Sequence, residues 1–80
     1  MPDLEFTEHA KEILVERNIP EPWVWHAIES PDRMTTESDN TVHYIKSIPE
    51  HGGRLLRVVV NPQAQRIVTI FFDRQLRSKI

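Results

Sequence analysis

Residues 54–73 read RLLRVVVNPQAQRIVTIFFD, and this stretch decides the fold. Two runs within it, Arg54–Asn61 and Arg66–Asp73, are dense in valine, leucine, isoleucine and phenylalanine, which favour strands. Between the two runs, residues 61–65 (NPQAQ) contain the asparagine and proline typical of a turn. A connection this short predicts that the two strands form an antiparallel hairpin.

Two further strands are predicted on the N-terminal side of this hairpin. Met34–Ser38 and Thr41–Ile48 have a strand-like period and are separated by a turn at Asp39 and Asn40. Residues 49–53 (PEHGG) form the next turn, because their two glycines permit positive φ angles. Four successive strands with short connections predict an antiparallel meander.

Before residue 33, the apolar residues recur at the spacing typical of helices. A first helix is predicted over Phe6–Asn18, with Thr7 as its N-cap. It ends before Pro20, because the residue that precedes a proline avoids the α region. Pro22 suits the first turn of a second helix, which runs to about Ser30. The sequence therefore predicts one α+β domain over residues 1–80, with two N-terminal helices packed on one face of a four-stranded antiparallel meander sheet (α-α-β-β-β-β).

The composition limits the classes of protein that this chain can belong to. It has 80 residues, no cysteine and a formal net charge of −2. A domain this short buries only about 60% of its unfolded surface, so good packing or a partner must stabilise it. Without cysteine there are no disulfides and no thiolate metal sites. The chain shows no signal-peptide pattern and no apolar run long enough to span a bilayer, so we expect a cytoplasmic protein with no membrane association.

Charge is divided unequally along the chain. Residues 1–32 hold two basic and eight acidic residues, a net charge of −6, whereas residues 33–80 hold eight basic and four acidic residues, a net charge of +4. Such a division can mark a nucleic-acid-binding face in the second half. Alternatively, acidic helices lie beside a basic sheet and help it to dock.

Strand alternation assigns the side chains of the last hairpin to two faces. If Val60 pairs with Arg66, then Val58 faces Val68 and Leu56 faces Ile70, and this set forms the core under the helices. The opposite face then gathers Leu55, Arg57, Val59, Ile67, Thr69 and Phe71. Because that face is mostly apolar, we expect it to be covered by the C-terminal tail, by a second copy or by another protein.

Arg57 is the main candidate for a functional residue. A strand arginine among apolar residues needs a partner for its charge, and the partner is either a phosphate, bound bidentately, or a cross-strand carboxylate. In one register of the hairpin around Gly52 and Gly53, Tyr44 and Lys46 share its face. In the other register, His43 and Ile45 flank Arg57 instead. A slip of one residue exchanges the two arrangements, and the irregular turn leaves both open.

Other candidates lie on the first helix. His9 is at the edge of its apolar stripe, where it either acts as a general acid or base or packs at the helix–sheet boundary. Arg17 falls within the same stripe, where its guanidinium needs a carbonyl or carboxylate partner. The four histidines lack HxxxH or HxH spacing, and the chain has no nucleotide-binding loop or serine-hydrolase motif. We therefore expect no metal site and no cofactor.

Five segments resemble a known family: residues 6–10 (FTEHA), 16–19 (ERNI), 28–32 (IESPD), 53–60 (GRLLRVVV) and 66–70 (RIVTI). In this order they resemble the bacterial domain-of-unknown-function family 4258, which is similar to the RelE/ParE-like toxin–antitoxin superfamily. The resemblance implies two helices on one face of a curved antiparallel sheet. It also implies that His9 and Arg17 occupy a motif of the first helix, and that Arg54 and Arg57 lie on an arginine-bearing strand preceded by Tyr44.

Two functional hypotheses follow. In the first, the chain is a toxin-like, metal-independent RNA endonuclease, as the resemblance implies for RelE-like members, and the ribose 2′-hydroxyl attacks the adjacent phosphate. The predicted catalytic residues are His9, Tyr44, Lys46 and Arg57, and the predicted phosphate-binding residues are Arg17, Arg54, Arg57 and Arg74. In the second, the chain is a non-catalytic interaction module that pairs with itself or adds a strand at a sheet edge. The expected partners are accordingly RNA or the ribosome, an antitoxin-like protein, or a second copy.

Overall fold

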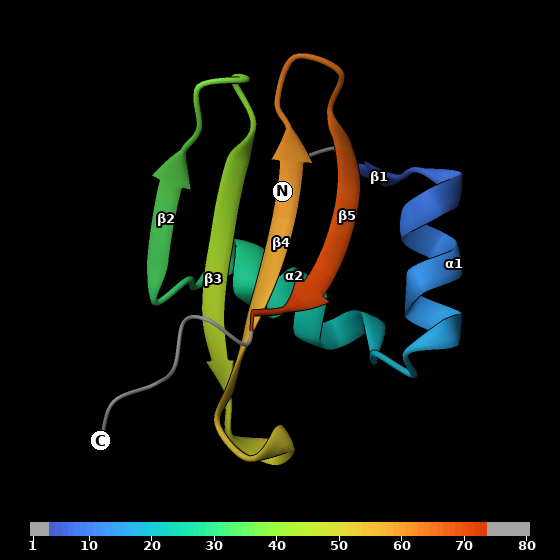
Figure 1. The fold of residues 1–80 in the computed structure, drawn as a ribbon, viewed down its shortest axis with the longest axis vertical. Coiled ribbons are helices and arrows are strands. Elements are labelled where there is room, and N and C mark those ends of the chain that lie inside the picture. The colour runs from blue at the N-terminus through green and yellow to red at the C-terminus, as the bar shows by residue number, and fades with distance from the viewer. Residues whose placement is uncertain (1–3, 74–80) are drawn as a thin grey trace.

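A computed structural model describes residues 4–73 (Figure 1). Its elements are β1 (Glu5–Phe6), α1 (Glu8–Glu16), α2 (Glu21–Glu29), β2 (Arg33–Thr36), β3 (Val42–Ile48), the 3₁₀ helix η1 (Pro49–His51), β4 (Arg54–Asn61) and β5 (Arg66–Phe72). The five strands form one sheet in the order β1-β5-β4-β3-β2. Strands β2 to β5 are antiparallel neighbours, as predicted, whereas β1 runs parallel to β5. The fold is therefore α+β, with a mixed sheet.

The four-stranded meander predicted from the sequence lacks β1. Two residues, Glu5 and Phe6, pair with Arg66 and Ile67 at the edge of the sheet. The Glu5 N–H donates to the Gln65 carbonyl at 3.1 Å, and the Glu5 carboxylate pairs with the Arg66 guanidinium at 2.9 Å. A strand of two residues is too short to show alternation, so no sequence pattern could have revealed it.

The two helices form where their capping residues predict. The Thr7 side chain accepts a hydrogen bond from the Ala10 N–H, which confirms Thr7 as the N-cap of α1. The helix ends at Glu16, and Asn18 then adopts a left-handed conformation with φ of 52°. Helix α2 has a proline in its first turn, as predicted.

The helices occupy different places on the sheet. In Figure 1, α2 lies across the rear face of the sheet, whereas α1 stands beside β5 at the edge. Both contribute to one core, which consists of Ala10, Ile19, Val24, Ala27, Ile28, Ile48, Leu56, Val58, Val60, Ile67 and Ile70. Within residues 4–73, no helix is long and apolar enough to cross a membrane.

The register of the last hairpin differs from the predicted one. Val60 lies opposite Ile67 rather than Arg66, and Val58 lies opposite Ile70 rather than Val68. A β-bulge between Val59 and Val60 causes the shift, because it adds one residue to one strand. Ile67, predicted to face away from the helices, is therefore fully buried in the core, and Leu56 lies opposite Phe72 instead of Ile70.

Candidate functional site

The pairing of β3 with β4 decides which side chains share a face with Arg57. Ile45 lies directly opposite Arg57, and His43 lies opposite Val59. Tyr44 and Lys46 lie opposite Val58 and Leu56, so their side chains point to the α2 side of the sheet. Of the two registers left open by the sequence, the structure has the one in which Ile45 and His43 flank Arg57.

The face of the sheet turned away from α2 is called the outward face here. Its central residues are His43, Ile45, Leu55, Arg57, Val59 and Phe71. Ile45 and Val59 are only 2% and 7% exposed, and Leu55 and Phe71 are half-buried. Ile45 and Val59 are therefore buried, whereas Leu55 and Phe71 remain partly accessible. The C-terminal tail, one of the three expected covers, lies outside the described residues.

Arg57 faces outward, as predicted, and its charge has a partner. Its Nη1 lies 3.4 Å from Oδ2 of Asp73, with side-chain exposures of 21% and 11% for the two residues. Asp73 is positioned by its backbone, because its N–H donates to the Leu55 carbonyl at 2.9 Å. The Arg57 Nε is buried without a hydrogen-bond partner. The cross-strand salt bridge, one of the two predicted partners, is thus present, and a phosphate at Arg57 must compete with Asp73.

His43 belongs to a chain of hydrogen bonds along β3 that the sequence analysis did not identify. The Thr41 hydroxyl donates to Asp39 Oδ1 at 2.6 Å and lies 3.2 Å from His43 Nε2. Because the hydroxyl proton is given to Asp39, the Thr41 oxygen accepts from His43 Nε2–H. In the neutral imidazole this arrangement places the proton on Nε2 and a lone pair on Nδ1. The Nδ1 atom is buried and has no hydrogen-bond partner.

The hydrogen bonds of Thr41 also affect the charge at Asp39. The donating Thr41 hydroxyl, together with the Thr41 backbone N–H at 3.0 Å, holds the pKa of the Asp39 carboxyl below its ordinary value of 3.8. Asp39 lies in the turn before β3, where Asn40 has a positive φ, so strand alternation does not apply to it. An aspartate that accepts from the residue two positions later is typical of such a turn, and the Asp-x-Thr spacing is the sequence signal that could have identified the group.

The other predicted site residues do not gather around Arg57. His9 lies on α1, where its Nε2 is 3.4 Å from the Thr69 hydroxyl. Arg17 is exposed at the C-cap of α1, and Arg54 is exposed at the start of β4, on the α2 side. Arg74 lies outside the described residues. The predicted catalytic and phosphate-binding residues therefore do not form one cluster in the part of the chain that the structure covers.

A shallow hollow of about 390 Å³ lies beside α2 and is lined by Trp23, His26, Asp32, Lys46, Ser47, Ile48, Pro49 and Glu50. Two of its charged residues have structural partners. The Lys46 Nζ donates to the Ser30 carbonyl at 3.0 Å, and an Asp32 carboxylate oxygen accepts from the Ser47 N–H at 2.8 Å. These bonds hold the end of α2 and the start of β2 against β3.

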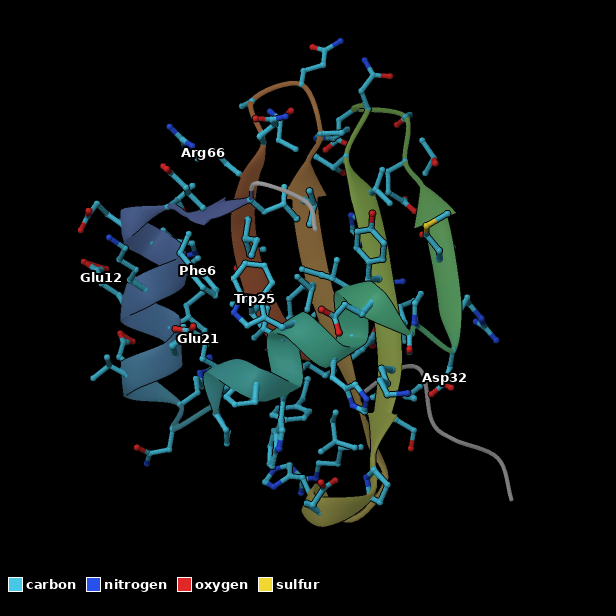
Figure 2. The ribbon with its side chains drawn as sticks, turned by 180° about the vertical axis from the view of Figure 1, so that it is seen from behind. Phe6, Glu12, Glu21, Trp25, Asp32 and Arg66 are labelled. Atoms are coloured by element: carbon cyan, nitrogen blue, oxygen red, sulfur yellow. The ribbon has the colours of Figure 1, made fainter. Side chains whose placement is uncertain are left out.

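Both tryptophans pack against the core from α2. Trp25 contacts Phe6 edge-to-face, with ring centroids 5.4 Å apart, and its indole N–H donates to Glu21 at 3.1 Å (Figure 2). Trp23 packs edge-to-face against Phe72. These contacts agree with a packing role for the tryptophans. The described residues contain no group of three or more histidine, aspartate or glutamate side chains arranged to hold a metal ion.

The outer edge of β2 is the remaining feature with binding potential. The Glu37 N–H donates to the Thr41 carbonyl, so the backbone groups of Glu37 point toward β3. Backbone direction alternates along a strand, so those of Thr35 and Arg33 also point toward β3. Met34 and Thr36 therefore direct their N–H and C=O groups away from the sheet. The Met34 side chain is 58% exposed. We call these outward backbone groups and side chains of β2 the β2 edge.

No curated protein and no solved structure shows a significant match to this chain. The sequence model of one family matches residues 6–72, from the end of β1 to the end of β5. The match includes both helices and the four antiparallel strands, and it confirms the resemblance to family 4258. The chain therefore belongs to the family described as a domain of unknown function (DUF4258).

Proposed function

We propose that this domain is a non-catalytic protein-interaction module that takes up a strand of a partner protein at the β2 edge. The outward N–H and C=O groups of Met34 and Thr36 carry this proposal, because such unpaired groups are a template for an added strand. A main-chain interaction of this kind needs no cluster of catalytic side chains, and the predicted catalytic residues are spread over both sides of the sheet.

The opposite edge of the sheet is less suited to strand addition. It ends in β1, which has only two residues and leads directly into α1. Helix α1 stands beside β5 and packs against it, which makes that edge less accessible to an added strand (Figure 1). Among the described strands, β2 is thus the one with a free side.

The class of partner is inferred from the resemblance to RelE/ParE-like toxin–antitoxin proteins. In such a pair a small antitoxin-like protein, encoded by a neighbouring reading frame in the same cytoplasm, binds the toxin-like domain.

The test uses the product of the neighbouring reading frame, co-expressed with the wild-type domain or with Met34→Pro. Proline at position 34 removes an outward N–H without removing a bond to β3, and prolines are tolerated on edge strands. Lys11→Glu on α1 serves as the control. We expect a complex with wild type and with the control, loss of the complex with Met34→Pro, and slower hydrogen exchange at Met34 and Thr36 in the complex. A complex that persists in Met34→Pro would refute strand addition.

Metal-independent RNA cleavage is the second candidate, and it is supported by one observation. The imidazole of His43, whose buried Nδ1 would have to be exposed by a turn of the ring, and the guanidinium of Arg57 lie on the same face of neighbouring strands. His43 would accept the proton of the ribose 2′-hydroxyl, whose oxygen forms a bond to phosphorus while the bond to the 5′-oxygen breaks. The protonated His43 then gives this proton to the departing 5′-oxygen, a 2′,3′-cyclic phosphate remains, and Arg57 stabilises the negative charge that develops.

RNA cleavage is tested by expressing the domain and following growth and messenger RNA on translating ribosomes. Growth arrest with cleavage that is lost in His43→Ala and Arg57→Ala, and retained in Tyr44→Phe and Lys46→Met, would support this candidate. The last two variants are matched controls, because their side chains lie on the α2 side of the sheet. Normal growth with intact RNA, in cells that contain folded protein, would eliminate it.

A further inference from the structure

We infer that, when no other protein occupies the β2 edge, it binds a second copy of this chain, joined by a two-fold axis through Thr35 into one continuous sheet. This inference rests on the proposed function, because it requires that β2 accept a strand. It specifies in addition which strand binds and in which register. Symmetric pairing of one patch with itself is the commonest way in which soluble proteins form dimers.

The backbone of β2 is compatible with this pairing. In an antiparallel pair centred on Thr35, Met34 of one copy lies opposite Thr36 of the other, and the reverse pair follows by symmetry. These are the two residues whose N–H and C=O groups point away from β3. The pairing therefore satisfies the outward groups of both strands at once, and it covers the exposed Met34 side chain.

The charges of β2 favour this register over the registers centred on Arg33 and on Glu37. With the axis at Thr35, Arg33 of each copy lies opposite Glu37 of the other, which gives two cross-strand pairs of opposite charge. An axis at Arg33 would place two arginines opposite each other, and an axis at Glu37 would oppose two glutamates. Opposed like charges destabilise a strand pair. The strand is thus complementary to itself in the register centred on Thr35.

Both charged side chains are available for this contact. Neither Arg33 nor Glu37 takes part in the ion pairs found among residues 4–73, and both are exposed. The Glu37 carboxylate accepts a hydrogen bond from the Thr35 hydroxyl at 2.8 Å, which holds it along the strand on the same side as Arg33. The carboxylate therefore already lies on the face where the arginine of a second copy would meet it.

A charge-exchange experiment tests the register. Arg33→Glu gives a strand with glutamate at both positions, and Glu37→Arg gives a strand with arginine at both. Each variant alone opposes like charges twice, so we expect its dimer to dissociate at least about tenfold more readily than wild type in sedimentation equilibrium. An equimolar mixture of the two variants restores both opposite-charge pairs, so we expect a heterodimer of near wild-type affinity.

The controls separate this inference from the proposed function. Lys11→Glu makes the same charge change as Arg33→Glu on α1 and should leave the dimer unchanged, while circular dichroism verifies that each variant is folded. A wild-type chain that stays monomeric at its highest soluble concentration overturns the inference, as does a mixture that fails to form the heterodimer. If a protein partner is nevertheless lost in Met34→Pro, the proposed function stands. If neither a dimer nor a partner depends on Met34, both fail.

Discussion

The hydroxyl of Thr7 joins α1 to the sheet, and its removal should have a large effect on stability. Its oxygen accepts a hydrogen bond from the Ala10 N–H at 3.1 Å, and its proton is donated to the Val68 carbonyl, also at 3.1 Å. The Thr7 N–H donates to the Ile67 carbonyl. One side chain thereby caps the helix and holds it to β5 beside the bulge. Thr7→Val removes the hydroxyl while retaining the shape and the extended backbone preference of threonine.

The expected magnitude is the sum of two contributions. Loss of an N-cap costs about 1 kcal/mol, and loss of a hydrogen bond between neutral groups costs about 1 kcal/mol. Thr7→Val should therefore lower the free energy of unfolding by about 2 kcal/mol. The total for a domain of this size is roughly 4–12 kcal/mol, and the Tm should fall by roughly 8–16 °C.

Urea denaturation of a series at position 7 separates the two contributions. Thr7→Ser keeps the hydroxyl and should stay within about 1 kcal/mol of wild type, because it loses one partly buried methyl group. Thr7→Asp caps the helix but cannot donate to Val68, so it should fall between serine and valine. A valine variant within about 0.5 kcal/mol of wild type would show that the hydroxyl does not hold α1 in place.

Three further outcomes are expected from the geometry of the sheet. Ile67→Ala should lower the free energy of unfolding by about 2–5 kcal/mol in urea titrations, because Ile67 is fully buried. Val68→Ala should lower it by less, because Val68 is half-buried. Equal losses in the two variants would contradict the bulge. Gln65 has φ of 54°, so Gln65→Gly should stabilise the domain by about 0.5–1 kcal/mol in thermal unfolding, a gain that Gln65→Ala should lack. Since the folded pKa of Asp39 lies below 3.8, its contribution to stability is complete above pH 3.8 and is lost as the pH falls through the folded value. An NMR titration should show Thr41→Val returning that pKa toward 3.8, and an unchanged value would refute the assigned cause.

The predictable parts of the fold are those with a long, regular period. The strand Arg54–Asn61 has the bounds predicted for it, and the ends of both helices lie within two residues of those predicted. Each of these elements was predicted from a repeated spacing of apolar residues or from a capping residue. The domain-of-unknown-function family was likewise identifiable from short segments in the right order.

The unpredicted parts arise from single residues that change a register. The register shift at Val59 and Val60 places Ile67 in the core rather than on the outward face, although both strands of this hairpin had been predicted. The turn before β4 contains a 3₁₀ helix and two glycines at positive φ, and its length decides whether Tyr44 or Ile45 faces Arg57. Composition does not encode such a one-residue choice, so the sequence left both registers open. In the structure Tyr44 and Lys46 lie on the α2 side of the sheet.

The unequal ends of the sheet limit what assembly through β2 can build. A fibre grows only if each subunit has two sheet edges that can bind another subunit, so that one edge stays free after each addition. Here one border is closed by α1 and a two-residue strand, and the other is consumed when two molecules meet. Because one edge of the sheet is covered, assembly through β2 stops at two molecules, and the domain can keep an exposed edge strand without polymerising.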